Sequence, residues 1–157
     1  MALPAIFSGL ARDPLQSTQP DVAPRLRLIT VQVEHGRGAM SQATVECEGP
    51  MEGQRTIGIQ KGSTSPGGDL RLAALATLDA VMQATCGALR LEFIGVKSVR
   101  AFDTNLIVVA VIAHFEGKAI RVVGSAIAAD DEPMTTARAT MHALNRLATP
   151  LLSRLID

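Results

Sequence analysis

The sequence predicts an α+β fold of two tandem βββα units, with a mostly antiparallel sheet and two helices packed on one face. The prediction rests on internal repeats, on strand-like alternation and on a helical segment at the end of each repeat. Leu26-Arg27-Leu28 recurs as Leu89-Arg90-Leu91, and Ala76-Thr77-Leu78-Asp79-Ala80 recurs as Ala139-Thr140-Met141-His142-Ala143, both 63 residues later. A period of this length, present twice, is typical of a duplicated unit folded into one pseudo-symmetric domain.

Two further motifs recur at slightly different spacings. Glu52-Gly53-Gln54 matches Glu116-Gly117-Lys118 after 64 residues, and Lys61-Gly62-Ser63 matches Val123-Gly124-Ser125 after 62. Small loop insertions would produce such drift between two copies of one unit.

The chain of 157 residues is long enough for one core, because a chain of this size buries about two thirds of its unfolded surface. We expect one domain over residues 25–157, made of repeats 25–87 and 88–148 and a short C-terminal segment. Hydrophobic residues make up 47% of the chain but aromatic residues only 3%, so this core must be aliphatic.

The charges of the chain balance, with 15 Lys plus Arg and 15 Asp plus Glu. Such a chain exerts no long-range attraction on nucleic acid or on an anionic membrane. It has no Trp or Tyr to stack on bases, and no run of about 18 apolar residues that could span a bilayer. The sequence therefore predicts neither a nucleic-acid partner nor a membrane partner.

The two cysteines, Cys47 and Cys86, have no metal-ligand spacing, so we expect reduced and mostly buried thiols. No residue pattern implies a metal ion or a cofactor. The first residues lack the basic start of a secretory signal, and Pro4 and Gly9 interrupt their apolar stretch. A soluble protein of the cytoplasm is the resulting expectation.

Residues 1–24 contain four prolines with polar residues between them, which predicts a flexible arm. The alternative is a docking segment with an apolar cluster at near-helical spacing, formed by Leu3, Ile6, Phe7 and Leu10. A segment of this kind fits a hydrophobic groove on a protein partner. The protein would then be an adaptor or a structural assembly subunit.

The first repeat predicts three strands in a meander, at residues 25–34, 42–48 and 55–61. A loop rich in Gly, Ser and Pro follows and leads to Asp69, a suitable N-cap for a helix. Gly87 is expected to end this helix in the left-handed conformation.

The second repeat predicts the same order, with strands at residues 89–99, 106–115 and 119–127. Pro133 opens its helix, which is expected to run to about Leu147. In both repeats the apolar parity of the first strand changes, after Leu28 in one and after Phe93 in the other. A β-bulge at the same place in each copy would account for this change.

Residues 106–113 are apolar at both parities, whereas an antiparallel strand with one wet face alternates. Two helices cover only one face of the sheet, so the other face needs a second layer. An identical chain across a two-fold axis supplies one, which predicts a homodimer or higher homo-oligomer through the helix-free sheet face or the helices. Alternatively, the arm and Pro150–Ile156 fold back over that face.

The order of elements and two sequence runs, Ala74–Val81 and Val122–Ala126, carry a resemblance. Over about residues 25–148 the chain resembles the C-terminal regulatory and dimerisation domain of 2-isopropylmalate and citramalate synthases. The resemblance implies a dimer that binds an end-product amino acid at the loops and helix starts. The catalytic barrel of those synthases has no counterpart here, and the first loop is longer and richer in Ser than the family's Gly-x-Gly-Pro pattern.

The loop before the first helix is the candidate ligand site. Backbone N–H groups and hydroxyls at a helix start favour a carboxylate or a phosphate. The candidate residues are Gly62, Ser63, Thr64, Ser65, Gly67, Gly68 and Asp69. The matching loop of the second repeat carries Asp130-Asp131-Glu132, which repels anions, so the first loop is preferred. The alternative is a plain connection that needs only glycine and an N-cap.

Catalytic chemistry has no signature in this chain. His35, His114 and His142 have no Cys, Ser or carboxylate neighbour at a sequence spacing that assembles a triad or a metal site, so they are expected to be structural or solvent-facing. Cys86 at a helix C-terminus faces the negative end of the dipole, which disfavours its use as a nucleophile. The sequence therefore predicts a non-catalytic, homo-oligomeric binding or regulatory module that senses a small carboxylate or amino acid.

Overall fold

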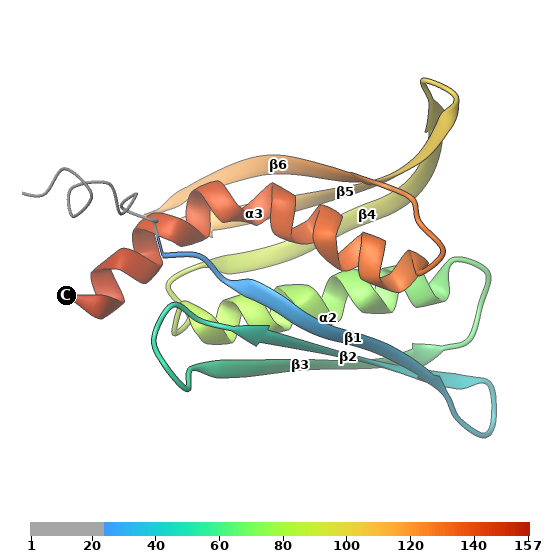
Figure 1. The fold of residues 1–157 in the computed structure, drawn as a ribbon, viewed down its shortest axis with the longest axis horizontal. Coiled ribbons are helices and arrows are strands. Elements are labelled where there is room, and N and C mark those ends of the chain that lie inside the picture. The colour runs from blue at the N-terminus through green and yellow to red at the C-terminus, as the bar shows by residue number, and fades with distance from the viewer. Residues whose placement is uncertain (1–23) are drawn as a thin grey trace, which may run out of the picture.

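The computed structural model describes residues 24–157, and the predictions for the N-terminal arm lie outside the described residues. Two groups of three strands are each followed by a helix (Figure 1). The elements are β1 (Arg27–His35), β2 (Met40–Glu48), β3 (Arg55–Ser63), α2 (Gly68–Ala84), β4 (Arg90–Ala101), β5 (Thr104–Phe115), β6 (Lys118–Ile127) and α3 (Glu132–Ile156). The α+β class and the repeated βββα units are confirmed.

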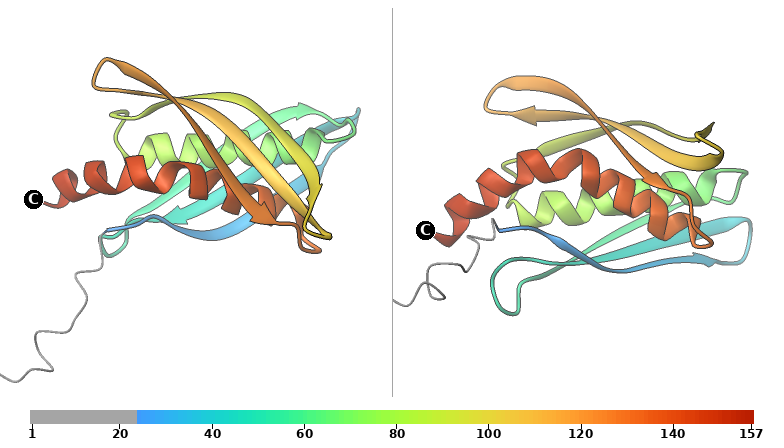
Figure 2. Two further views of the ribbon diagram at one scale, coloured as in Figure 1. Left: turned by 90° about the horizontal axis from the view of Figure 1, so that it is seen from above. Right: turned by 45° about the horizontal axis from the view of Figure 1, so that its top comes forward.

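The strands form two separate antiparallel sheets, with the helices layered between them (Figure 2). Sheet A has the order β1-β2-β3 and sheet B has the order β4-β5-β6. The single sheet expected from the sequence is thus divided. Each helix packs on the sheet of its own repeat and also contacts the first strand of the other repeat, which closes the core from both sides.

Helix α2 is buried around most of its circumference because it lies between two sheets. Its buried side chains are small, with Ala at five of the core positions: Ala73, Ala74, Ala76, Ala80 and Ala84. Small residues let the sheets and α3 approach closely, and burial on several sides removes the single apolar stripe of a surface helix. The inward side chains of the central strands complete the aliphatic core, with Val45, Ile107, Val109 and Val111 fully buried.

The duplication is visible at the closest approach of helix and sheet. A Cβ built on Gly58 of β3 would overlap the carbonyl oxygen of Ala76 in α2. Gly124 of β6 meets Ala139 of α3 in the same way. Gly124 therefore corresponds to Gly58 in the structure, which corrects the match with Gly62 suggested by the local sequence. The reason is that packing against the helix fixes the register of the third strand.

Helix side chains also cover the free edge of the third strand in each repeat. The carboxylate of Asp79 accepts a hydrogen bond from the Ile59 N–H at 3.1 Å. At the equivalent place His142 Nδ1 accepts one from the Ser125 N–H at 3.2 Å. Asp79 and His142 occupy the same position of the repeated helix, so the duplicated backbone geometry is kept while the side chains differ.

The predicted bulges are present in both repeats. The register shifts between Leu28 and Thr30 where β1 pairs with β2, and between Phe93 and Gly95 where β4 pairs with β5. An extra residue in one strand reverses the parity of the positions after it. This explains why both parities of the first strand hold apolar residues.

The helix ends differ from expectation in two places. Gly67, in the left-handed conformation, is the N-cap of α2, and Asp69 lies in the first turn instead of capping it. Helix α3 runs through Pro150 to Ile156, well beyond Leu147. The burial of Leu151 and Leu152 holds the continued helix despite the N–H that proline lacks. Pro150–Ile156 therefore belong to the middle layer and do not fold back over an outer sheet face. Gly87 has a φ of 77°, as the C-terminal prediction required.

Neither helix of the described part is both long and apolar enough to cross a membrane.

Candidate functional site

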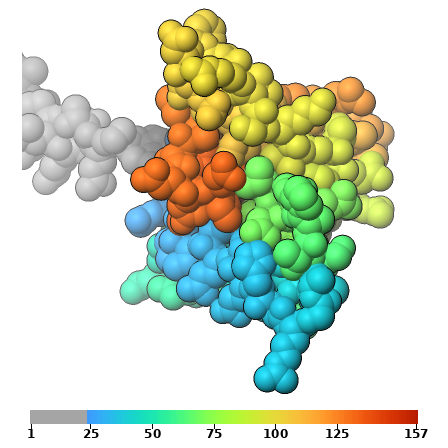
Figure 3. All heavy atoms as spheres, turned by 90° about the vertical axis from the view of Figure 1, so that its right-hand side faces the viewer, coloured from blue at the N-terminus to red at the C-terminus, as the bar shows by residue number. Residues whose placement is uncertain are grey.

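The predicted ligand loop joins β3 to α2 at the end of the molecule where the β1–β2 and β4–β5 hairpin tips project (Figure 3). Gly62 and Ser63 still belong to β3, whereas Gly67 and Gly68 begin the helix. The Gly68 N–H donates to the Ser65 carbonyl at 2.8 Å. The loop is therefore a tight turn that satisfies part of its own backbone.

Side chains from β1 and β2 join this loop. The hydroxyls of Ser41 and Thr64 lie 2.6 Å apart, and His35 Nδ1 lies 2.9 Å from the Ser41 oxygen. His35 Nε2 lies 3.3 Å from a carboxylate oxygen of Asp69. Sequence reasoning did not predict this cluster. The signal that could have indicated it is the β1–β2 hairpin, in whose register His35 pairs directly with Ser41.

The cluster contains the residue types of a hydrolytic triad, Asp69, His35 and Ser41, but its serine is not accessible to a substrate. Ser41 is buried, and its hydroxyl is already bonded to Thr64. A nucleophile must reach the reacting carbon of a substrate. In this arrangement the cluster instead ties the β1–β2 hairpin to the start of α2.

The neighbouring cavity opens beside the loop and not within it. It has a volume of about 290 Å³, and its lining includes His35, Ser41 and Lys61 but none of residues 62–69. The predicted loop residues therefore occupy one place in the fold without lining this cavity. The carboxylate of Asp69 adds a negative charge at the helix start, which opposes a small anion there.

The loop before α3 supplies an acidic residue that caps this helix. Asp131 is the N-cap of α3, and its Oδ1 accepts a hydrogen bond from the Met134 N–H at 3.0 Å. In contrast, the N-cap of α2 has no side-chain hydrogen bond. Of the two helix starts, the one in the first repeat is thus the less fully satisfied.

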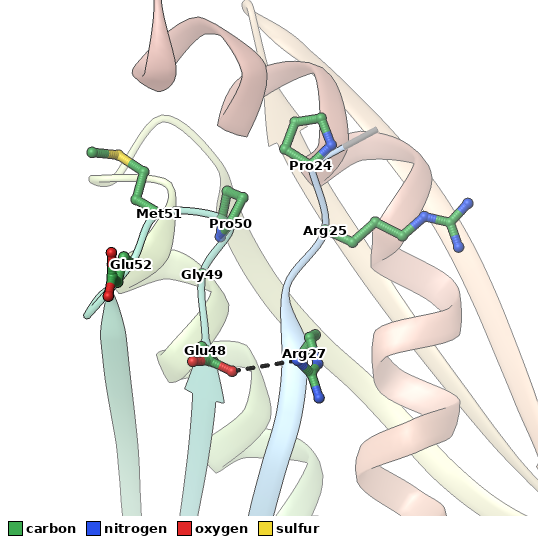
Figure 4. Close-up of a pocket in the computed structure, with 8 residues that line it drawn as sticks. All are labelled: Pro24, Arg25, Arg27, Glu48, Gly49, Pro50, Met51 and Glu52. Atoms are coloured by element: carbon green, nitrogen blue, oxygen red, sulfur yellow. Dashed lines mark ion pairs between the residues drawn. The ribbon is translucent and has the colours of Figure 1, made fainter. Parts of the chain in front are cut away.

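A cavity of about 540 Å³ lies at the opposite end of sheet A, where the described chain begins (Figure 4). Arg27 and Glu48 form an ion pair across it at 3.7 Å. Arg25 points away towards α3, and Glu52 points to the other side (Figure 4). The charged groups do not converge on a common point, so the cavity lacks the arrangement that would orient one small ligand.

The outer faces of the two sheets differ strongly in polarity. Side chains that point away from the helices in sheet A are mostly polar: Thr30, Gln32, Glu34, Gln42, Thr44, Glu46, Glu48, Arg55 and Lys61, with Met40, Ile57 and Ile59 as the apolar exceptions. In sheet B the centre of the corresponding face is apolar: Val99, Leu106, Val108, Ala110, Ile112, Val123 and Ile127. We call this set the apolar face of sheet B.

Charged and polar residues border this apolar face and also interrupt it. Arg90, Glu92 and Arg121 lie at one end of the face, whereas Lys97 and Ser125 lie on either side of Val108 within it. His114 Nε2 lies 2.9 Å from a carboxylate oxygen of Glu92. An apolar centre with a polar rim is the composition of a protein–protein interface.

The cysteines differ in environment. Cys47 of β2 is fully buried, as expected, whereas Cys86 after α2 is exposed, so the expectation of two buried thiols is corrected. Desolvation by burial, with a smaller effect of the Glu46 charge, raises the pKa of Cys47 to about 11. Among residues 24–157 no group of three His, Cys, Asp or Glu side chains could hold a metal ion.

Comparison with known proteins gives no match to any protein-family model and none to a curated protein.

Proposed function

We propose that the protein is a self-associating binding or regulatory module, a homodimer whose two copies meet through the apolar face of sheet B. The observation that carries the proposal is the contrast between the outer faces. The outer face of sheet A is mostly polar, with three exposed apolar side chains, whereas Val, Ile and Leu predominate at the centre of the outer face of sheet B. Because both sheets have the same relation to the helices, the core does not require this difference.

The extent of the apolar face is compatible with this role. Seven residues of β5, from Leu106 to Ile112, extend about 24 Å, and three strands span about 14 Å. The face thus covers about 300 Å² in projection, which is the size of the largest apolar patch on a typical monomer, a patch that is often functional. Val123 and Ile127 expose 57% and 66% of their surface there, which a partner would remove from water.

The oligomeric state of the full chain tests this proposal. Light scattering during size-exclusion chromatography is expected to give twice the mass of one chain. Val123→Lys places a charge on the β6 side of the central row of the face and is expected to give monomers. Ile57→Lys is the matched control, since Ile57 lies on the corresponding strand of sheet A and is 48% exposed. A monomeric wild-type chain, or equal effects of the two variants, would contradict the proposal.

Sensing of a small carboxylate or amino acid at residues 62–69 is the second candidate function. It is favoured by the N-cap of α2, which lacks the side-chain hydrogen bond present at α3. A thermal-shift screen with branched-chain amino acids and small organic acids tests it. A ligand at 100 times its dissociation constant stabilises the folded state by about 2.7 kcal/mol. Unchanged melting temperatures across the screen would remove this candidate.

A further inference from the structure

We infer that the two-fold axis of the homodimer runs parallel to β5, so that β4 of each copy lies across β6 of the other. This inference rests on the proposed function and specifies how the second copy docks. A two-fold axis that relates two facing sheets must lie in the plane between them. For aligned packing of the two sheets, the choice is between an axis close to the strand direction and an axis close to the perpendicular direction.

The register of sheet B fixes what each choice brings together. Side chains of the apolar face form rows across β4, β5 and β6. Four successive rows are Glu92–Ile112–Arg121, Gly95–Ala110–Val123, Lys97–Val108–Ser125 and Val99–Leu106–Ile127. An axis along β5 places each row opposite the same row of the partner, and it places β4 opposite the partner's β6. An axis across the strands through Ala110 keeps β4 on β4 and reverses the order of the rows.

Shape favours the axis along β5. A hollow of about 270 Å³ lies on the β4 side of the face, lined by Ile94, Gly95, Val96, Lys97, Val99, Val108 and Ala110. On the β6 side of the same row Val123 projects from the surface. With the axis along β5, the partner's Val123 enters the hollow at Gly95. With the axis across the strands, Val123 would stand on the partner's Val123 and the hollow on the partner's hollow.

Charge is complementary in this arrangement, although only shape distinguishes it from the axis across the strands, which would place Glu92 opposite the partner's Lys97. The axis along β5 places Glu92 opposite the partner's Arg121, and the same pair forms a second time by symmetry. Among the described residues Arg121 has no ion-pair partner within its own chain. Glu92 contacts His114 through one oxygen, and its other oxygen is left to accept from the guanidinium.

Packed sheets are rotated by about 30° relative to one another, which tilts the two-fold axis about 15° away from β5 and makes the alignment best at the centre of the face. The Glu92 row lies only one step along the face from the central Gly95 row. At this distance the long side chains of Glu92 and the partner's Arg121 span the displacement that the rotation produces. The pair is therefore a sensitive reporter of the orientation.

Charge exchange tests the axis, with the dimer dissociation constant measured by sedimentation of the full chain. Glu92→Arg places an arginine opposite the partner's Arg121 at two symmetric positions. The repulsion between these like charges is expected to raise the dissociation constant at least about tenfold. Adding Arg121→Glu to the same chain is expected to restore it to within about threefold of the wild type.

Lys97 provides the matched control. The axis across the strands would place Glu92 opposite the partner's Lys97, because Lys97 lies one row to the other side of Ala110. Glu92→Arg combined with Lys97→Glu is therefore expected to stay weak. Recovery by this pair, and not by the Arg121 pair, would overturn the axis along β5.

Gly95→Val tests the hollow independently of charge. A Cβ at Gly95 meets no atom within 4 Å apart from its neighbours in sequence, so the monomer is expected to fold normally. Filling the hollow should exclude the partner's Val123 and raise the dissociation constant at least about tenfold. An unchanged constant would overturn the inference, and the proposed homodimer would stand if Val123→Lys still gave monomers. A wild-type chain that is monomeric would contradict both.

Discussion

Gly58 and Gly124 lie at two positions where an added methyl group is expected to lower the stability of the fold. Each lies against the backbone of a helix, at Ala76 and Ala139 respectively. Gly58→Ala and Gly124→Ala must therefore push helix and sheet apart, and each is expected to lower the free energy of unfolding by about 1–3 kcal/mol. Urea denaturation measures this change. Gly36→Ala, whose new methyl group would meet only an ordinary contact, should leave the midpoint nearly unchanged.

The buried thiol of Cys47 predicts a loss of stability at alkaline pH. Its pKa in the folded protein is raised from 9.0 to about 11, chiefly by desolvation. The unfolded chain therefore releases the thiol proton at a lower pH than the folded protein. The buried neutral thiol contributes fully to the free energy of unfolding below pH 9, and this contribution is lost as the pH rises towards 11. The loss is about 3 kcal/mol. Cys47→Ala isolates this effect, because its stability should fall less over that interval in urea titrations. A parallel fall in both proteins would contradict it.

Helix α3 depends on a cap that α2 lacks. The side chain of Asp131 accepts the Met134 N–H, so Asp131→Ala is expected to lower the free energy of unfolding by about 1 kcal/mol. Asp130→Ala is the control for charge near the helix dipole, since Asp130 precedes the cap and makes no side-chain hydrogen bond among the described residues. Thermal denaturation should separate the two variants. Equal losses would indicate that the charge, and not the cap, stabilises the helix.

The sequence predicted the elements well where a local physical rule determines them. The bulges after Leu28 and Phe93 follow from the change of apolar parity, and the left-handed Gly87 follows from its place after the helix. The rule failed at Asp69, because Gly67 in the left-handed conformation is the N-cap of α2 and the Asp69 carboxylate contacts His35 instead. It failed again at Pro150, where burial of the following leucines outweighs the intrinsic cost of proline in a helix.

The arrangement of the layers was harder to predict than the elements. Apolar residues at both parities of β5 indicated that each face of that strand needs a cover. They did not indicate that the helices would separate the strands into two sheets, because this depends on contacts between α2 and both repeats. The cluster of His35, Ser41 and Asp69 was missed for the same reason, since its members come from three elements.

The shared middle layer predicts that the whole molecule unfolds in one step. Helix α2 packs against both sheets, and α3 contacts β1 as well as β5 and β6, so neither repeat has a core of its own. Leu78→Ala in the first repeat and Ile107→Ala in the second remove buried side chains and should each cost about 2–5 kcal/mol. Because both mutations act on one cooperative unit, each should shift a single urea transition. In a Cys86→Ser background, which removes the exposed thiol, circular dichroism of the helices and exposure of Cys47 to a thiol reagent should change together. A variant in which Cys47 becomes reactive while most of the helical signal remains would show that the first repeat unfolds alone, and that the duplicated units are coupled less tightly than their shared helices imply.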